Sequence, residues 1–212
     1  SVFESEYLDS LAKHRGVGVL PGLGASPGQT NVLSRHLAGR MDIVEEVRFF
    51  MVNDASDSSE SVWRHRLALF GQSVLLYDCG RWTQTPGMSE FQDIEFPSPW
   101  ASIRCYTVGL ETVTIPTSFP SLRHASVWRG FSDPTTTETL KGLIDSGFSA
   151  EDPVIVDGVP VSPAGMAAAM LAGSPPKGSG GVVDRLPRQV RVKGIKDGRP
   201  AELTMTYSFP PG

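Results

Sequence analysis

The sequence has little cysteine, no long apolar run and no excess of basic residues. Its 212 residues include only Cys79 and Cys105, too few for a disulfide framework, and we expect both thiols to be buried and inert. No stretch approaches the ~20 apolar residues of a membrane span, and none has the layout of a signal peptide. The 19 Lys and Arg against 23 Asp and Glu give a net charge of −4, which argues against a nucleic-acid platform. We therefore expect a cytoplasmic protein that binds neither nucleic acid nor membrane.

Sequence motifs for metals and nucleotides are also missing. No H-x-x-E-H or C-x-x-C pattern occurs, so no metal site is predicted, and no Walker A sequence is present. The run from Gly22 to Pro27 has the first two glycines of G-x-G-x-x-G but proline in place of the third, so no cofactor site is predicted in this chain. The four histidines are expected to be structural, and only for His124, which precedes a predicted strand, does a catalytic role stay open.

The chain is long enough for one good-sized domain over residues 1–212, and its 40% hydrophobic content suits a globular fold. Apolar periodicity predicts an α+β fold, with a mostly antiparallel or mixed sheet and helices packed on one face. The predicted helices are 1–15, 26–37, 61–71, 135–145 and 162–171. The predicted strands are 17–20, 41–53, 74–77, 91–96, 103–108, 112–115, 124–128, 182–195 and 201–209. Residues 80–87 are predicted to be rich in turns, and residues 173–181 to form a flexible internal loop.

The stretch from Val17 to Leu37 is predicted to form a strand, a glycine-rich turn and a helix. Ser26 is predicted to cap the helix and Pro27 to occupy its first position, where a missing N–H costs nothing. The N-terminus of this helix would then direct unpaired N–H groups and a positive dipole end toward a carboxylate or phosphate in an open cavity. A tight connection that needs positive φ is the alternative interpretation.

Several short motifs occur in an order that resembles a known family. They are G-x-x-P-G-x-x-N at Gly24, Pro27, Gly28 and Asn31, then DCGRW (78–82), FPSPW (96–100), YTVGLETVTIP (106–116), WRGF (128–131) and a closing hairpin. Together they resemble the part of saccharopine dehydrogenase-like oxidoreductases that follows the nucleotide-binding half. The resemblance implies the substrate-binding and dimerisation domain of a longer protein, whose Rossmann domain would hold NAD or NADP. By itself this chain would be inactive.

The resemblance also implies where a substrate would lie. It assigns an anionic, amino-acid-like substrate to six residues: Gly24, Ser26, Pro27, Gly28, Asn31 and Arg129. In the family an arginine near this last position is associated with the substrate carboxylate. Here Val127 occupies that position and Arg129 is displaced by two residues, which keeps it on the same face of a strand. Catalytic residues are not identified.

Two other functions stay open from the sequence. The long hairpin at 190–209 has an apolar face for which no covering helix is predicted, which favours a homodimer and a non-catalytic oligomerisation or ligand-sensing domain. Alternatively, residues 22–28 could be a degenerate phosphate site of a self-contained enzyme.

Overall fold

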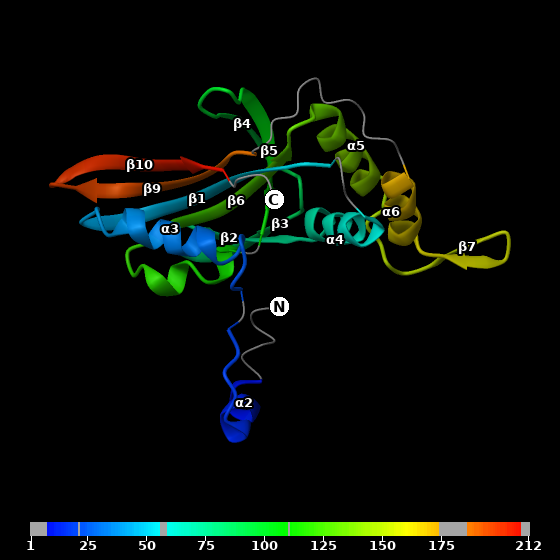
Figure 1. The fold of residues 1–212 in the computed structure, drawn as a ribbon, viewed down its shortest axis with the longest axis horizontal. Coiled ribbons are helices and arrows are strands. Elements are labelled where there is room, and N and C mark those ends of the chain that lie inside the picture. Colours follow the sequence, from blue (N-terminus) through cyan, green and yellow to red (C-terminus); the bar gives the residue numbers. More distant parts are fainter. Residues whose placement is uncertain (1–7, 21, 56–58, 110, 174–185, 209–212) are drawn as a thin grey trace.

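A mixed eight-stranded sheet forms the centre of the computed structural model, which describes residues 8–20, 22–55, 59–109, 111–173 and 186–208 (Figure 1). Its order is β10-β9-β1-β6-β2-β3, and β5 also pairs with β6 and carries β4. These strands are β1 Ile43–Asn53, β2 Val74–Asp78, β3 Arg81–Thr85, β4 Phe91–Glu95, β5 Ser102–Val108, β6 His124–Phe131, β9 Arg188–Lys196 and β10 Arg199–Tyr207. The β7 and β8 strands, Val154–Val156 and Val159–Val161, form a separate hairpin. The predicted α+β class with a mixed sheet is confirmed.

Helices occupy much of the chain between the strands. They are α2 Asp9–Arg15, α3 Gln29–Ala38, α4 Glu60–Gly71, α5 Pro134–Asp145 and α6 Pro163–Gly173, with short 3₁₀ turns η1 Glu111–Val113 and η2 Pro116–Ser118. Buried side chains of α3, α4, α5 and α6 all join one hydrophobic cluster. Among the described residues, none of the helices has both the length and the apolar character needed to cross a bilayer.

The β1 strand is buried because its sequence is apolar on both faces near its end. Val47, Phe49 and Met51 point into the cluster that the helices cover. Phe50 and Val52 point the other way, into a smaller cluster with Ile94, Phe96, Cys105 and Trp128. Side chains of a strand alternate between the two faces of a sheet, so the helices pack mainly on the first face.

The sheet divides into two branches at β6. The β1 and β6 strands are parallel from Glu46 paired with His124 to Asn53 paired with Phe131. On its other side β6 is shared between two strands: Ala125 pairs with Tyr77 of β2, whereas residues 127–129 pair with β5. The two branches, β2–β3 and β5–β4, therefore pair with different segments of β6.

The first part of the chain differs from prediction. Residues 17–20 are not a strand, and Val17, Val19 and Leu20 are exposed, because no strand of the described sheet pairs with them. The predicted first helix is described only from Asp9, and α2 buries none of its residues. Residues 1–7 of that prediction lie outside the described part.

Four further predictions need correction. Residues 81–85 form β3 instead of a turn, because Cys79 and Gly80 adopt positive φ and reverse the chain tightly after β2. Residues 111–113 and 116–118 form 3₁₀ turns, so the extended segment predicted at 112–115 is wrong. The α4 helix begins at Glu60 with Ser59 as its N-cap, two residues before Ser61, the cap expected from the sequence. Of the loop predicted at 173–181, Gly173 ends α6 and the remaining residues lie outside the described part.

The closing hairpin forms as predicted, but its apolar face is covered. The α3 helix contacts both β9 and β10. Leu203 and Met205 of β10 are partly buried against the main cluster, beside Val190 and Val192 of β9. The predicted lack of a covering helix is therefore wrong, and these four side chains pack within the chain itself. The hairpin's outer strand, β10, is an edge of the sheet.

Candidate functional site

The glycine-rich loop before α3 has a different cap from the one predicted. The helix begins at Gln29, and its N-cap is Gly28. Ser26 and Pro27 lie before the helix, so the predictions that they occupy the N-cap and the first helical position are wrong. Gly28 has φ of +127°, and a Cβ there would lie 2.2 Å from the carbonyl oxygen of Gly24. Only glycine permits this backbone and this close approach.

Hydrogen bonds close this loop on itself. The Gly28 N–H donates to Asn31 Oδ1 at 3.1 Å, the Gln29 N–H to the Gly24 oxygen at 2.9 Å, and the Gly24 N–H to the Pro27 oxygen at 2.8 Å. Three amides of the loop are therefore already bonded within it. Neither of the two cavities described below is lined by this loop. A degenerate phosphate site gains no support from amides that already bond within the loop.

The fold nevertheless brings two of the predicted residues together. The Arg129 Nη2 donates a hydrogen bond to Ser26 Oγ at 2.5 Å, across 103 residues of sequence. Arg129 lies on the helix-covered face of β6, between Met51 of β1 and Tyr106 of β5. Asn31 points elsewhere, and its Nδ2 donates to Thr114 Oγ1 at 2.7 Å.

A second arginine, Arg66 of α4, comes close to Arg129. Its guanidinium stacks over the rings of Trp63 and Phe131, 4.9 and 5.2 Å from their centroids, and donates to the Asp54 carbonyl oxygen at 2.6 Å. Burial lowers the pKa of Arg66, and the positive charge of Arg129 acts in the same direction, against the opposing effect of Asp54. The Asp54 charge acts on Arg66 more strongly than Arg129 does, so a carboxylate already offsets part of the repulsion between the two guanidinium groups. Nothing in the local sequence of Arg66 signals this position.

The two arginines, together with Ser26, form what we call the arginine cluster. Arg129 lies two residues before the end of β6, and Asn53 of the parallel β1 is followed directly by Asp54, which accepts the hydrogen bond from Arg66. The β1 and β6 strands are the parallel pair of the described sheet, and the cluster lies at the carboxyl ends of both strands.

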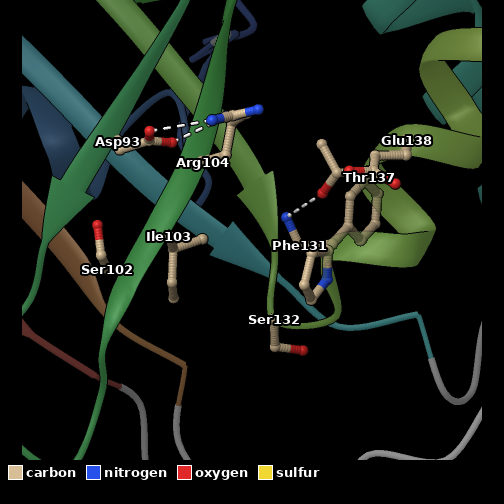
Figure 2. A pocket seen from close by; sticks show the side chains of 9 residues that line it. Asp93, Ser102, Ile103, Arg104, Phe131, Ser132, Thr137 and Glu138 are labelled. Atoms are coloured by element: carbon tan, nitrogen blue, oxygen red, sulfur yellow. Dashed lines mark hydrogen bonds and ion pairs between the residues drawn. The ribbon is translucent and has the colours of Figure 1, made fainter.

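A cavity of about 400 Å³ lies beside the start of α5, also at the end of β6 (Figure 2). Arg104 of β5 donates to Asp93 of β4 at 2.9 Å, and this hydrogen bond holds the pKa of Asp93 below its usual value. Glu138 of α5 and Ser132 complete the polar wall (Figure 2). Arg104, the cation among its described lining residues, is already paired with Asp93.

A larger cavity of about 530 Å³ lies in the fork of the sheet, between the β2–β3 and β5–β4 branches. Polar side chains dominate its wall. Glu46 and Arg48 form an ion pair at 2.7 Å, and His124 Nδ1 lies 2.7 Å from Asp78 Oδ1. Sequence reasoning left a role for His124 open but could not pair it with Asp78.

The two thiols differ sharply. Cys105 is fully buried, and burial raises its pKa to about 12, as expected for an inert thiol. Cys79 is exposed, so its predicted burial is wrong. The reason is its place in the tight turn between β2 and β3, where the backbone has positive φ and the side chain projects from the end of the hairpin.

Comparison with solved structures relates this fold to an oxidoreductase. The chain superposes on apo histidine-tagged saccharopine dehydrogenase (L-Glu forming) from Saccharomyces cerevisiae with a TM-score of 0.52. The match covers 88% of this chain and 58% of that protein, at 13% identity. Identity this low shows a related fold alone, and this chain spans little more than half of that protein's length. No family model matches the sequence.

Proposed function

We propose that this chain is the substrate-binding and dimerisation domain of a saccharopine dehydrogenase-like, NAD(P)-dependent oxidoreductase. The observation that carries the proposal is the hydrogen bond from Arg129 to Ser26 with Arg66 close by, in a fold related to the yeast enzyme. Half-buried guanidinium groups recognise carboxylates by forked hydrogen bonds. The substrate class is accordingly an anionic, amino-acid-like molecule.

The dinucleotide would be held outside this chain, by the Rossmann domain of a longer parent protein. The closed loop at Gly24–Gly28 supports this division, because its amides already bond to one another. The role of this chain's residues is to bind and orient the substrate. Arg129 and Arg66 would hold a carboxylate, and Ser26 would fix the Arg129 side chain while the site is empty.

Equilibrium binding to the full 212-residue chain tests the proposal. Since the yeast enzyme is described as L-Glu forming, L-glutamate is the first probe, with NADPH and NADH titrated separately. We expect L-glutamate to bind, and the Arg129→Met variant to bind at least about tenfold more weakly, because a hydrogen bond to a charged group contributes about 1.5–3 kcal/mol. The matched control is Arg199→Met, since Arg199 is an exposed arginine at the start of β10.

Two results would contradict the proposal. One is tight binding of NADPH or NADH to this chain, since the cofactor would then need no second domain. The other is equal L-glutamate affinity in Arg129→Met, Arg199→Met and the unaltered chain.

A non-catalytic oligomerisation domain is the second candidate. The observation that favours it is the β7–β8 hairpin, which protrudes from the body and exposes Val154, Ile155, Val156 and Val159 (Figure 1). Exposed apolar segments of this kind often mark contacts with another protein. Light scattering coupled to size exclusion tests it: a strict monomer would remove the dimerisation role from both proposals.

A further inference from the structure

Three metal-binding side chains converge at the rim of the fork cavity, although they come from two distant parts of the sequence. Asp78 ends β2, Cys79 follows it in the turn to β3, and His124 begins β6. One potential ligand atom from each lies within 4.8 Å of the other two. Asp78 and His124 also line the cavity in the fork.

Backbone geometry explains why they meet. Tyr77 pairs with Ala125 in an antiparallel register, which places Asp78 directly beside His124. The Gly80 N–H donates to the carbonyl oxygen of Arg123 at 3.0 Å, so the turn itself is tied to the start of β6. Cys79 has φ of +48° and Gly80 +77°, the two positive values of a two-residue hairpin turn. The positions of the three side chains are thus fixed by the sheet.

We propose that Asp78, Cys79 and His124 form a binding site for a zinc-like transition-metal ion. Thiolate, imidazole and carboxylate together are the ligand set of Zn²⁺, whereas Mg²⁺ and Ca²⁺ take oxygen ligands. Metal–ligand distances of about 2.0–2.3 Å place the donors of a tetrahedral site about 3.3–3.8 Å apart. Donors within 4.8 Å reach that spacing by small rotations of exposed side chains.

Metal binding needs His124 Nδ1 and Cys79 Sγ without their protons. The imidazole proton shared with Asp78 Oδ1 is then carried on Nε2, in the other neutral tautomer, so the hydrogen bond is replaced by one bond from each residue to the metal. The Cys79 thiol releases its proton to solvent. Three protein ligands leave a fourth position for water or a ligand in the cavity, the arrangement of an open site. Glu46, which pairs with His124 across β1 and β6, stays bonded to Arg48 and does not compete.

Titration of the full chain with Zn²⁺, and separately with Co²⁺, tests this site. We expect one ion per chain and a thiolate-to-Co²⁺ charge-transfer absorption band. Cys79→Ser should abolish that band, and both Cys79→Ser and His124→Gln should weaken Zn²⁺ binding at least about 100-fold, since loss of even an outer-shell partner costs 10–100-fold. His65→Gln is the matched control, because His65 is an exposed histidine on α4 and Cys105 remains the same buried thiol in every variant.

Any of three results would overturn the proposal. The first is a lack of stoichiometric Zn²⁺ binding, and the second is a lack of the Co²⁺ charge-transfer band in the unaltered chain. The third is a Zn²⁺ affinity that is unchanged in Cys79→Ser and His124→Gln. Circular dichroism of each variant checks that the fold is retained, which we expect because all three side chains lie at the surface or are partly exposed.

Discussion

The β5 and β6 strands approach so closely at Gly130 that no side chain fits between them. A Cβ at Gly130 would lie 2.2 Å from the carbonyl oxygen of Arg104 and 3.3 Å from Cys105 Sγ. Gly130→Ala must therefore push the two strands apart, next to Arg129. Overpacking costs about 1–3 kcal/mol, and a clash with backbone belongs at the upper end. At about 2–4 °C per kcal/mol for this chain length, Tm should fall by roughly 6–12 °C.

Gly142→Ala is the matched control for this substitution. Gly142 lies in α5, and an added Cβ there meets nothing within 4 Å. Alanine should stabilise this helical position by about 0.5–1 kcal/mol. Both variants are compared with the unaltered chain by calorimetry in one buffer. If Gly130→Ala melted no lower than the unaltered chain, the close approach of Gly130 to the Arg104 carbonyl oxygen would be refuted.

Three further predictions concern single groups. In the native chain at pH 8 a thiol reagent should modify Cys79 and spare Cys105, whose pKa of about 12 reflects burial, and mass spectrometry that finds both modified would contradict the packing. Arg104 holds the pKa of Asp93 below its unfolded value, so this pair contributes stability above about pH 4 that is lost as pH falls through the folded pKa. The difference in Tm between the unaltered chain and Arg104→Met should therefore shrink as pH falls through that range. A difference in Tm that stays constant with pH would count against the pair. Asp133 accepts hydrogen bonds from two N–H groups at the start of α5, so Asp133→Ala should cost about 1 kcal/mol in urea unfolding, and no loss would show that the cap is not formed.

Much of the fold could be predicted because several of its strands and turns have strong local sequence patterns. The β1 strand is a run of β-branched and aromatic residues, and the Asp197-Gly198 turn gives a clear hairpin. The same logic misleads at residues 17–20, where an apolar run has no described strand to pair with. It also missed β7–β8, although Asp157-Gly158 is the same kind of turn, because its strands have only three residues each.

The sites were less predictable than the fold. Ser26 and Arg129 were both predicted to hold substrate, but only the folded chain reveals that they meet. Arg66 gave no signal, because its position depends on how α4 packs against the end of β6. The group at Asp78, Cys79 and His124 lacks any metal-binding spacing in sequence, since His124 follows Asp78 by 46 positions and only strand pairing closes that gap.

The most direct test of the proposed function follows the arginine side chains themselves. NMR of the guanidinium N–H groups, recorded while L-glutamate is titrated into the full chain, reports which arginines contact the ligand. We expect the signals of Arg129 and Arg66 to shift together and saturably, while that of Arg199 stays unchanged. Shifts confined to other arginines, or no saturable shift at Arg129, would contradict an anion site at the arginine cluster.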